Sequence, residues 1–159
     1  MIADRLPSHA WPTRARLVVT AVEAETGEFR AFDARSGVDL VDAVAASCAV
    51  PLVWPPIPID GRHYVDGGVR SPANADLATS ADRVIVIAPI GNAVRPSGRV
   101  DRQLAALGPG VRTLKVTPDA AARAAFGRNV LDPARRAPAA RAGRAQVPSV
   151  VDAVRAVWT

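Results

Sequence analysis

The chain has 159 residues, of which 49% are hydrophobic and 22% charged, a length and balance typical of a single globular domain with one sizeable core. The sequence shows neither an N-terminal signal peptide nor the run of ~18 apolar residues that a membrane-spanning helix needs, so a soluble, cytoplasmic protein is expected. The single cysteine excludes an intrachain disulfide and is compatible with a reducing compartment.

The formal net charge of +5 is unevenly distributed along the chain. Residues 1–119 hold 13 basic and 13 acidic side chains, whereas residues 120–159 hold seven arginines against two aspartates. We therefore divide the chain into residues 1–119 and a basic, Ala- and Arg-rich helical segment at residues 120–159, which is expected to pack on the same domain. Such a segment can contact an anionic membrane surface. It lacks the interleaved aromatic residues and the reading motif of a nucleic-acid-binding protein, so no nucleic-acid partner is expected.

The first elements in chain order are two strands and a helix. The Val-rich run at residues 16–24 is typical of a strand buried on both faces, and residues 29–34 alternate weakly as the second strand of a hairpin. Ser36 followed by Asp39 resembles a capping box, which predicts a helix that ends before Pro51. The apolar face of this helix is expected to consist of Val41, Val44, Ala45 and Cys48.

The middle of the chain alternates between extended and helical segments. Residues 51–61 are too rich in proline for a helix or a central strand, and we expect a rigid connector with a packed Trp54. Residues 62–66 are predicted as a short strand, residues 72–79 as a short helix and residues 82–90 as a buried strand.

The C-terminal part continues this alternation. A helix closed by Gly108, a strand at residues 111–118 and a helix ended by Gly127 are expected in turn. Residues 133–148, rich in Ala, Arg and Pro, are expected to be partly disordered, and Ser149 is expected to cap a last helix. The alternation of strands and helices predicts an α/β fold.

The stretch "HYVDGGV" places a carboxylate at the end of a predicted strand and two glycines directly after it. Asp66 lies where α/β sheets bind their ligands, and Gly67 and Gly68 permit a positive φ or a close approach of the backbone. Because Asp-Gly is also a common turn pair, spacing alone leaves both an ordinary turn and a functional site open.

An ordered set of motifs resembles the C-terminal half of a patatin-like phospholipase domain. The set comprises a helix ending in Ala-Ser-Cys-Ala-Val-Pro at residues 46–51, a Pro-Pro connector at 55–56, the Asp-Gly-Gly box at 66–68, Asn74 and the strand at 82–90. The resemblance extends from residue 16 over most of the chain. It implies the C-terminal portion of a three-layer α/β/α sandwich with a mixed, mainly parallel sheet, the family domain being partly represented in residues 1–119.

In this family the aspartate of the box is the partner of a serine nucleophile, in a Ser-Asp dyad that hydrolyses lipid esters. The resemblance therefore implies that Asp66 is the catalytic base and that Gly67 and Gly68 shape the active-site turn, with a structural role for Asn74. The implied partner is a lipid ester, a phospholipid or an acylglycerol, and neither a metal nor another cofactor is expected.

The nucleophile of this chemistry is not found in the sequence. The family's serine lies in a G-x-S-x-G elbow, and no serine here has both glycines: Ser8, Ser36, Ser47, Ser71, Ser80, Ser97 and Ser149. The glycine-rich oxyanion loop is also absent, so the chain is expected to be inactive alone and to be a fragment, a truncated gene product or a misplaced start. The alternative is a non-enzymatic, degenerate relative that binds lipid or a protein.

Three other side chains could take part in chemistry. His63 lies three residues before Asp66, but neighbouring strand residues alternate faces, so a surface or packing role is expected. Cys48 has no partner at metal-ligand spacing and is expected to be a buried small side chain. Ser47, next to it, is not on an elbow.

Overall fold

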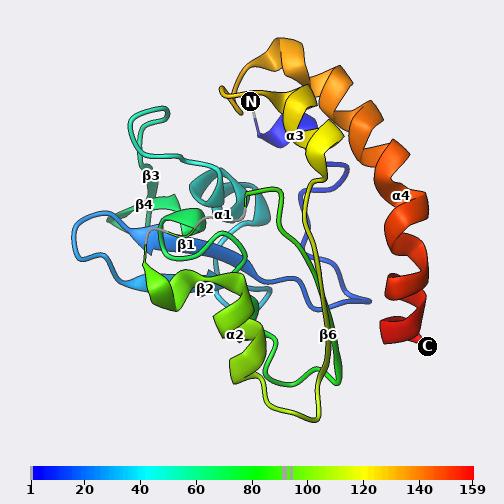
Figure 1. Cartoon of the computed structure of the whole chain (residues 1–159). Coiled ribbons are helices and arrows are strands. Elements are labelled where there is room, and N and C mark those ends of the chain that lie inside the picture. The colour runs from blue at the N-terminus through cyan, green and yellow to red at the C-terminus, as the bar shows by residue number, and fades with distance from the viewer. Residues whose placement is uncertain (1, 91–92, 94) are drawn as a thin grey trace. The chain divides into compact units, whose positions relative to one another are not determined.

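A computed structural model describes residues 2–90, 93 and 95–159 of the chain, which clusters into two compact units (Figure 1). Unit 1 comprises Met1–Asn74 and Ala93–Gly98, and unit 2 comprises Ala75–Asn92 and Arg99–Thr159. Both units contain strands and helices, so the predicted α/β class is confirmed. The division at residue 120, which rests on composition, stays a prediction.

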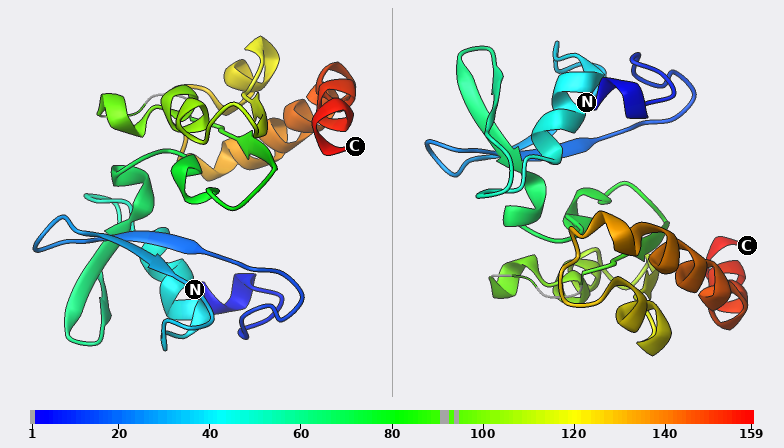
Figure 2. Two further views of the ribbon diagram at one scale, coloured as in Figure 1. Left: turned by 90° about the horizontal axis from the view of Figure 1, so that it is seen from below. Right: turned by 90° about the horizontal axis from the view of Figure 1, so that it is seen from above.

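Unit 1 is built on a four-stranded antiparallel sheet in the order β2-β1-β4-β3. Its elements in chain order are η1 (Ala3–Arg5), β1 (Val19–Glu23), β2 (Phe29–Phe32), α1 (Leu40–Ser47), β3 (Ile57–Ile59), β4 (Arg62–Asp66), η2 (Gly67–Val69) and η4 (Pro96–Gly98). The predicted hairpin is confirmed as β1 and β2, and the predicted short strand as β4. Helix α1 packs on one face of this sheet, against β1, β3 and β4 (Figure 2).

The core of unit 1 lies between α1 and the sheet. Ala43 and Ala46 on the helix are completely buried, as is Ala21 on the sheet, so small side chains allow the helix to approach the strands closely. Larger side chains fill the remaining space, and the rings of Phe32 and Tyr64 meet edge to face with their centroids 5.3 Å apart. Aromatic residues are few in the sequence, but two of them are used at this one contact.

Helix α1 differs from its prediction in its start and in its buried face. It begins after Asp39, and the hydroxyl of Ser36 instead donates to a backbone carbonyl three residues earlier. Its buried side chains are Leu40, Ala43 and Ala46. The expectation of a buried Cys48 is wrong, because the helix ends at Ser47 and the cysteine that follows is exposed.

The proline-rich connector between α1 and β3 is only partly as expected. Pro58 lies in β3, which is an edge strand and therefore tolerates a residue without an N–H donor. The expectation of a packed Trp54 is wrong, since 61% of this residue is exposed, and the neighbouring Leu52 is exposed too.

Unit 2 contains a pair of parallel strands and four helical segments beyond the short turn η3. Its elements are η3 (Ala75–Leu77), β5 (Arg83–Ile87), α2 (Val100–Ala106), β6 (Arg112–Val116), α3 (Ala120–Phe126), η5 (Pro133–Arg135) and α4 (Arg136–Trp158). α4 contacts both strands, and α3 lies beside it (Figure 1). Parallel pairing in the described residues is confined to β5 and β6, where α2 supplies the crossover that parallel strands need. In unit 1, short turns join β1 to β2 and β3 to β4, and both pairs are antiparallel.

The long helix α4 replaces the disordered segment and the short last helix that the sequence predicts. It runs unbroken from Arg136 and includes Pro148, so Ser149 is an interior residue and not a cap. The Gln146 side chain binds the backbone on both sides of Pro118, donating to the Thr117 carbonyl at 2.7 Å and accepting from the Asp119 N–H at 3.1 Å. This tertiary contact is a reason why an Ala- and Pro-rich segment is helical.

Candidate functional site

Asp66 is the last residue of β4 and is tied to the backbone on two sides. It pairs with Ala21 of β1 across the sheet, and its N–H donates to the Ala49 carbonyl at 3.0 Å. Its side-chain oxygen Oδ1 accepts a hydrogen bond of 2.7 Å from the Gly68 N–H and so caps the 3-10 turn η2. The residue is half-buried, and within the described chain its oxygen Oδ2 has no hydrogen-bond partner.

A side chain at either glycine after Asp66 would meet a close neighbour, the Thr20 backbone at Gly67 and the Asp66 carboxylate at Gly68. A Cβ atom on Gly67 would lie 2.3 Å from Thr20 Oγ1 and 2.6 Å from the Thr20 carbonyl oxygen. A Cβ atom on Gly68 would lie 2.9 Å from Asp66 Oδ1, the oxygen that caps the turn. Neither glycine has a positive φ, so close approach, and not left-handed backbone, accounts for both.

Asn74 holds this turn against the sheet. Its side-chain amide donates to the carbonyl of Gly67 at 3.2 Å, to that of Ser71 at 3.1 Å and to Thr20 Oγ1 at 3.3 Å. Its Oδ1 accepts from the Arg70 guanidinium at 2.7 Å. Asn74 is buried and has a φ of 46°, a left-handed conformation that asparagine tolerates better than most residues. These contacts give Asn74 the structural role that was expected of it.

The serine of this segment is part of the scaffold. Ser71 is 1% exposed, and its hydroxyl donates to the Gly98 carbonyl at 2.9 Å while accepting from the N–H groups of Ala73 and Asn74. A serine nucleophile must present its hydroxyl to a substrate, which a buried and bonded hydroxyl does not do.

Cys48 lies close enough to Asp66 for the two side chains to interact electrostatically. Partial desolvation, and then the Asp66 carboxylate, raise the pKa of the Cys48 thiol, while Arg5 opposes the shift. A raised pKa keeps the sulfur as a thiol, which is the weakly nucleophilic form. In the described part of the chain no hydrogen bond joins Ser47 to Asp66.

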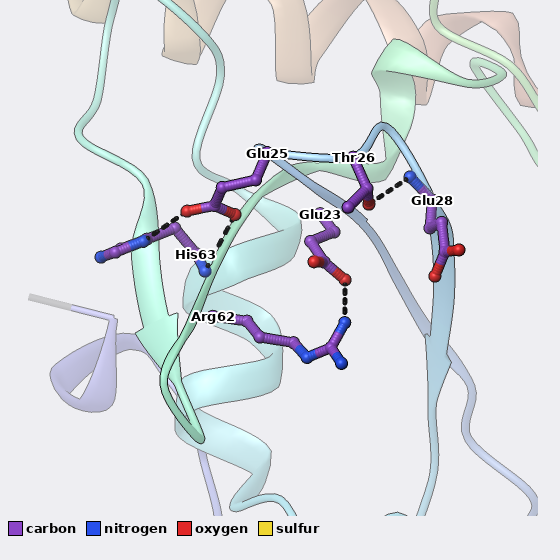
Figure 3. A network of polar contacts seen from close by, with 6 residues as sticks. All are labelled: Glu23, Glu25, Thr26, Glu28, Arg62 and His63. Carbon is purple, nitrogen blue, oxygen red and sulfur yellow. Dashed lines mark hydrogen bonds and ion pairs between the residues drawn. The ribbon is translucent and has the colours of Figure 1, made fainter.

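His63 takes part in a polar network at the opposite edge of the sheet (Figure 3). Its Nδ1 lies 2.6 Å from Glu25 Oε1, and this hydrogen bond holds the pKa of Glu25 below its usual range. In the same network the buried Glu23 accepts from Arg62 Nη1 at 2.7 Å, which raises the pKa of the guanidinium. His63 is therefore a surface residue, one of the two roles expected of it, and it is bound to Glu25. The structure does not bring it together with Asp66.

Neither a membrane-spanning helix nor a metal-binding cluster is found among the described residues. No helix in residues 2–90, 93 and 95–159 combines the length and the apolar character needed to cross a bilayer. Within those same ranges, no three His, Cys, Asp or Glu side chains are grouped so that they could hold a metal ion.

The comparison with protein families identifies the segment that carries this turn. Residues 3–79 match the family model described as patatin-like phospholipase. This match supports the resemblance of the chain to the patatin-like family. The matched range contains Asp66, both glycines and Asn74; it begins before residue 16, where the sequence resemblance started, and ends before β5. No match is found among curated proteins.

Sequence patterns gave no signal for Thr20, although this residue explains why the Asp-Gly-Gly box needs Gly67. Thr20 lies in a run of apolar residues, and its contact with the box depends on the pairing of β1 with β4. Knowledge of which strand lies beside β4 would have been required to find it.

Proposed function

We propose that this chain carries the catalytic aspartate of a patatin-like lipid acyl hydrolase, with Asp66 as the general base of a Ser-Asp dyad. One observation carries this assignment. The Asp66 carboxylate is fixed through Oδ1 by the Gly68 N–H, while Oδ2 has no partner in the described residues, at the end of a strand inside the matched segment.

The chemistry follows from this orientation. As a serine hydroxyl attacks the carbonyl carbon of a lipid ester, its proton passes to Oδ2, and the serine oxygen forms the new bond to carbon. Because Oδ1 is already an acceptor for Gly68, the carboxylate presents one defined oxygen to that proton. The packing of Gly67 against Thr20 and the contacts of Asn74 hold the backbone that carries the base.

The 159 residues contain no G-x-S-x-G elbow from which this serine could come. Ser71 is buried and bonded, and the Cys48 thiol is kept protonated. We therefore expect the chain alone to bind lipid esters at this site without hydrolysing them at a measurable rate.

The test compares the chain with two variants that each remove one negative charge. Asp66→Asn keeps an oxygen that can accept from the Gly68 N–H but removes the base, and Asp60→Asn is the control, an exposed residue in the turn between β3 and β4. Hydrolysis of a short-chain nitrophenyl ester and labelling by a serine-directed fluorophosphonate are measured for all three. The expected result is no hydrolysis and no label.

Hydrolysis by the unmodified chain would show that a nucleophile is present after all, and the Asp66 variant then tests the base. A loss of about 10²–10⁴-fold in Asp66→Asn alone would support the assignment of Asp66. Equal hydrolysis in all three proteins would contradict it. Binding of an uncharged acylglycerol, which lacks the phosphate of a phospholipid, that Asp66→Asn leaves unchanged, without hydrolysis, would favour the non-enzymatic alternative.

A further inference from the structure

Three arginines surround a cavity at one edge of the unit 1 sheet. The cavity measures ≈ 330 Å³ and is formed by the segment before β1 and the segment after β2. Ligand sites in proteins range over roughly 300–1,000 Å³, so this volume suits a small molecule or one end of a larger one. We call it the Arg14–Arg35 pocket; its polar lining consists of Thr13, Arg14, Arg16, Asp33 and Arg35.

Two guanidinium groups of this pocket have no partner among the described residues. Asp33 is its one acidic side chain: Oδ1 accepts from the Arg35 backbone N–H at 2.9 Å, and Oδ2 lies 4.0 Å from Arg16. The side chains of Arg14 and Arg35 form neither a hydrogen bond nor an ion pair within the described residues. Three arginines against one aspartate give the lining a formal charge of +2.

The wall of the pocket is apolar and fixed in place. The indole N–H of Trp11 donates to the Val38 carbonyl at 2.9 Å, and the Trp11 side chain also packs against the core. Pro12 and Leu17 extend this wall, and Leu17 is 39% exposed although it lies two residues before the largely buried strand β1. A basic rim beside an apolar wall fits a ligand that has an anionic head and an apolar body.

The strand directions place this pocket at the same edge of the sheet as the proposed base. Val19 at the start of β1 pairs with Phe32 at the end of β2, and Asp66 at the end of β4 pairs with Ala21. The segments that form the pocket and the Asp66 turn therefore leave the sheet at the same end of the strands. The network around Glu25 lies at the other end.

We propose that the Arg14–Arg35 pocket binds the phosphate group of an anionic amphiphile. A phosphate monoester carries a charge of about −1.5 to −2 at neutral pH, which matches the lining, and guanidinium groups bind its oxygens in a bidentate manner. That the same molecule is the lipid ester cleaved beside Asp66 rests on the proposed function. The binding itself does not.

The experiment measures binding by titration calorimetry with three probes that share the phosphate chemistry. Inorganic phosphate and glycerol phosphate represent soluble sources, and dihexanoyl phosphatidic acid, used below its micelle concentration, represents a lipid headgroup. Arg14→Gln/Arg35→Gln is the test variant. Arg102→Gln/Arg128→Gln is the control, since it removes the same charge from two exposed arginines of unit 2.

We expect the lipid phosphate to bind at least tenfold more tightly than either soluble probe, because only the lipid also covers the apolar wall. Loss of both pocket arginines is expected to weaken its binding about tenfold or more, with little change in the control. Equal weakening in the two double variants would overturn the pocket, because net charge would then explain the binding. Equal affinities for all three probes would overturn the proposal that the ligand is an amphiphile.

Two readouts separate this inference from the proposed function and from misfolding. Asp66→Asn is expected to bind the lipid phosphate as tightly as the unmodified chain. The pocket proposal can therefore hold even if Asp66 is not the catalytic base. Because Arg14 and Arg35 are exposed and their side chains unbonded, both double variants should keep the circular dichroism spectrum of the unmodified chain. Absence of lipid binding by a folded, unmodified chain would overturn the pocket alone.

Discussion

Two close approaches around Asp66 decide which residues fit there. Gly67 lies so close to Thr20 that a methyl group would overlap three of its atoms, and the Gly68 N–H must reach Asp66 Oδ1. The sequence alone locates the box, because two glycines after an acid are conspicuous. It does not distinguish close packing from positive φ, since both favour glycine.

Asn74→Asp tests whether the Asn74 amide holds the turn. The substitution keeps the shape of the side chain but replaces its donor nitrogen by an oxygen that faces the carbonyls of Gly67 and Ser71. Because the residue is buried, we expect the free energy of unfolding to fall by about 1–3 kcal/mol, measured by urea denaturation at neutral pH. Asn129→Asp is the matched control, since exposed Asn129 uses only its acceptor oxygen, toward the Leu131 N–H. Equal losses in both variants would contradict the role of Asn74.

At the scale of elements, the sequence predicts those segments whose signal is local. β1 and β5 lie in apolar runs, and α3 has both its cap and its stop in the sequence: Asp119 accepts from the Ala122 N–H, and Gly127 has a φ of 67°. Elements that depend on distant contacts are predicted poorly. The start of α1 follows from burial against the sheet, and the length of α4 from its packing on β5, β6 and α3.

The helix α4 contains two prolines in different positions, which predicts two different effects of substitution. Pro148 is an interior residue, so it leaves the Arg144 carbonyl without its helical donor, whereas Pro138 lies in the first turn, where N–H groups have no helical partner. We expect Pro148→Ala to stabilise the protein by up to about 3 kcal/mol and Pro138→Ala to change stability by less than about 1 kcal/mol. Thermal denaturation followed by circular dichroism measures both. A larger gain from Pro138→Ala would contradict an unbroken helix through Pro148.

At the scale of the whole molecule, the two units have separate sets of buried residues. The hydrophobic cluster around Ala21, Phe32 and Tyr64 lies within unit 1, whereas Val84 and Leu104 are among the buried residues of unit 2. The catalytic proposal and the phosphate pocket both concern unit 1, and the excess of arginines at residues 120–159 concerns unit 2. The sequence does not signal this division, because neither unit is one continuous segment. Residues 93–98 belong to unit 1, whereas the segments before and after them belong to unit 2.

Gly67→Ala tests whether the two units lose structure independently. The added Cβ would lie 2.3 Å from Thr20 Oγ1, so the backbone must shift, and overpacking of this kind costs typically about 1–3 kcal/mol. We expect amide hydrogen exchange, measured by mass spectrometry, to quicken in β1 and β4 and to stay unchanged in β5 and β6. Gly110→Ala is the control, because open space surrounds that glycine. Faster exchange in both units would mean that they unfold together, and unchanged exchange in β1 and β4 would contradict the close contact between Gly67 and Thr20.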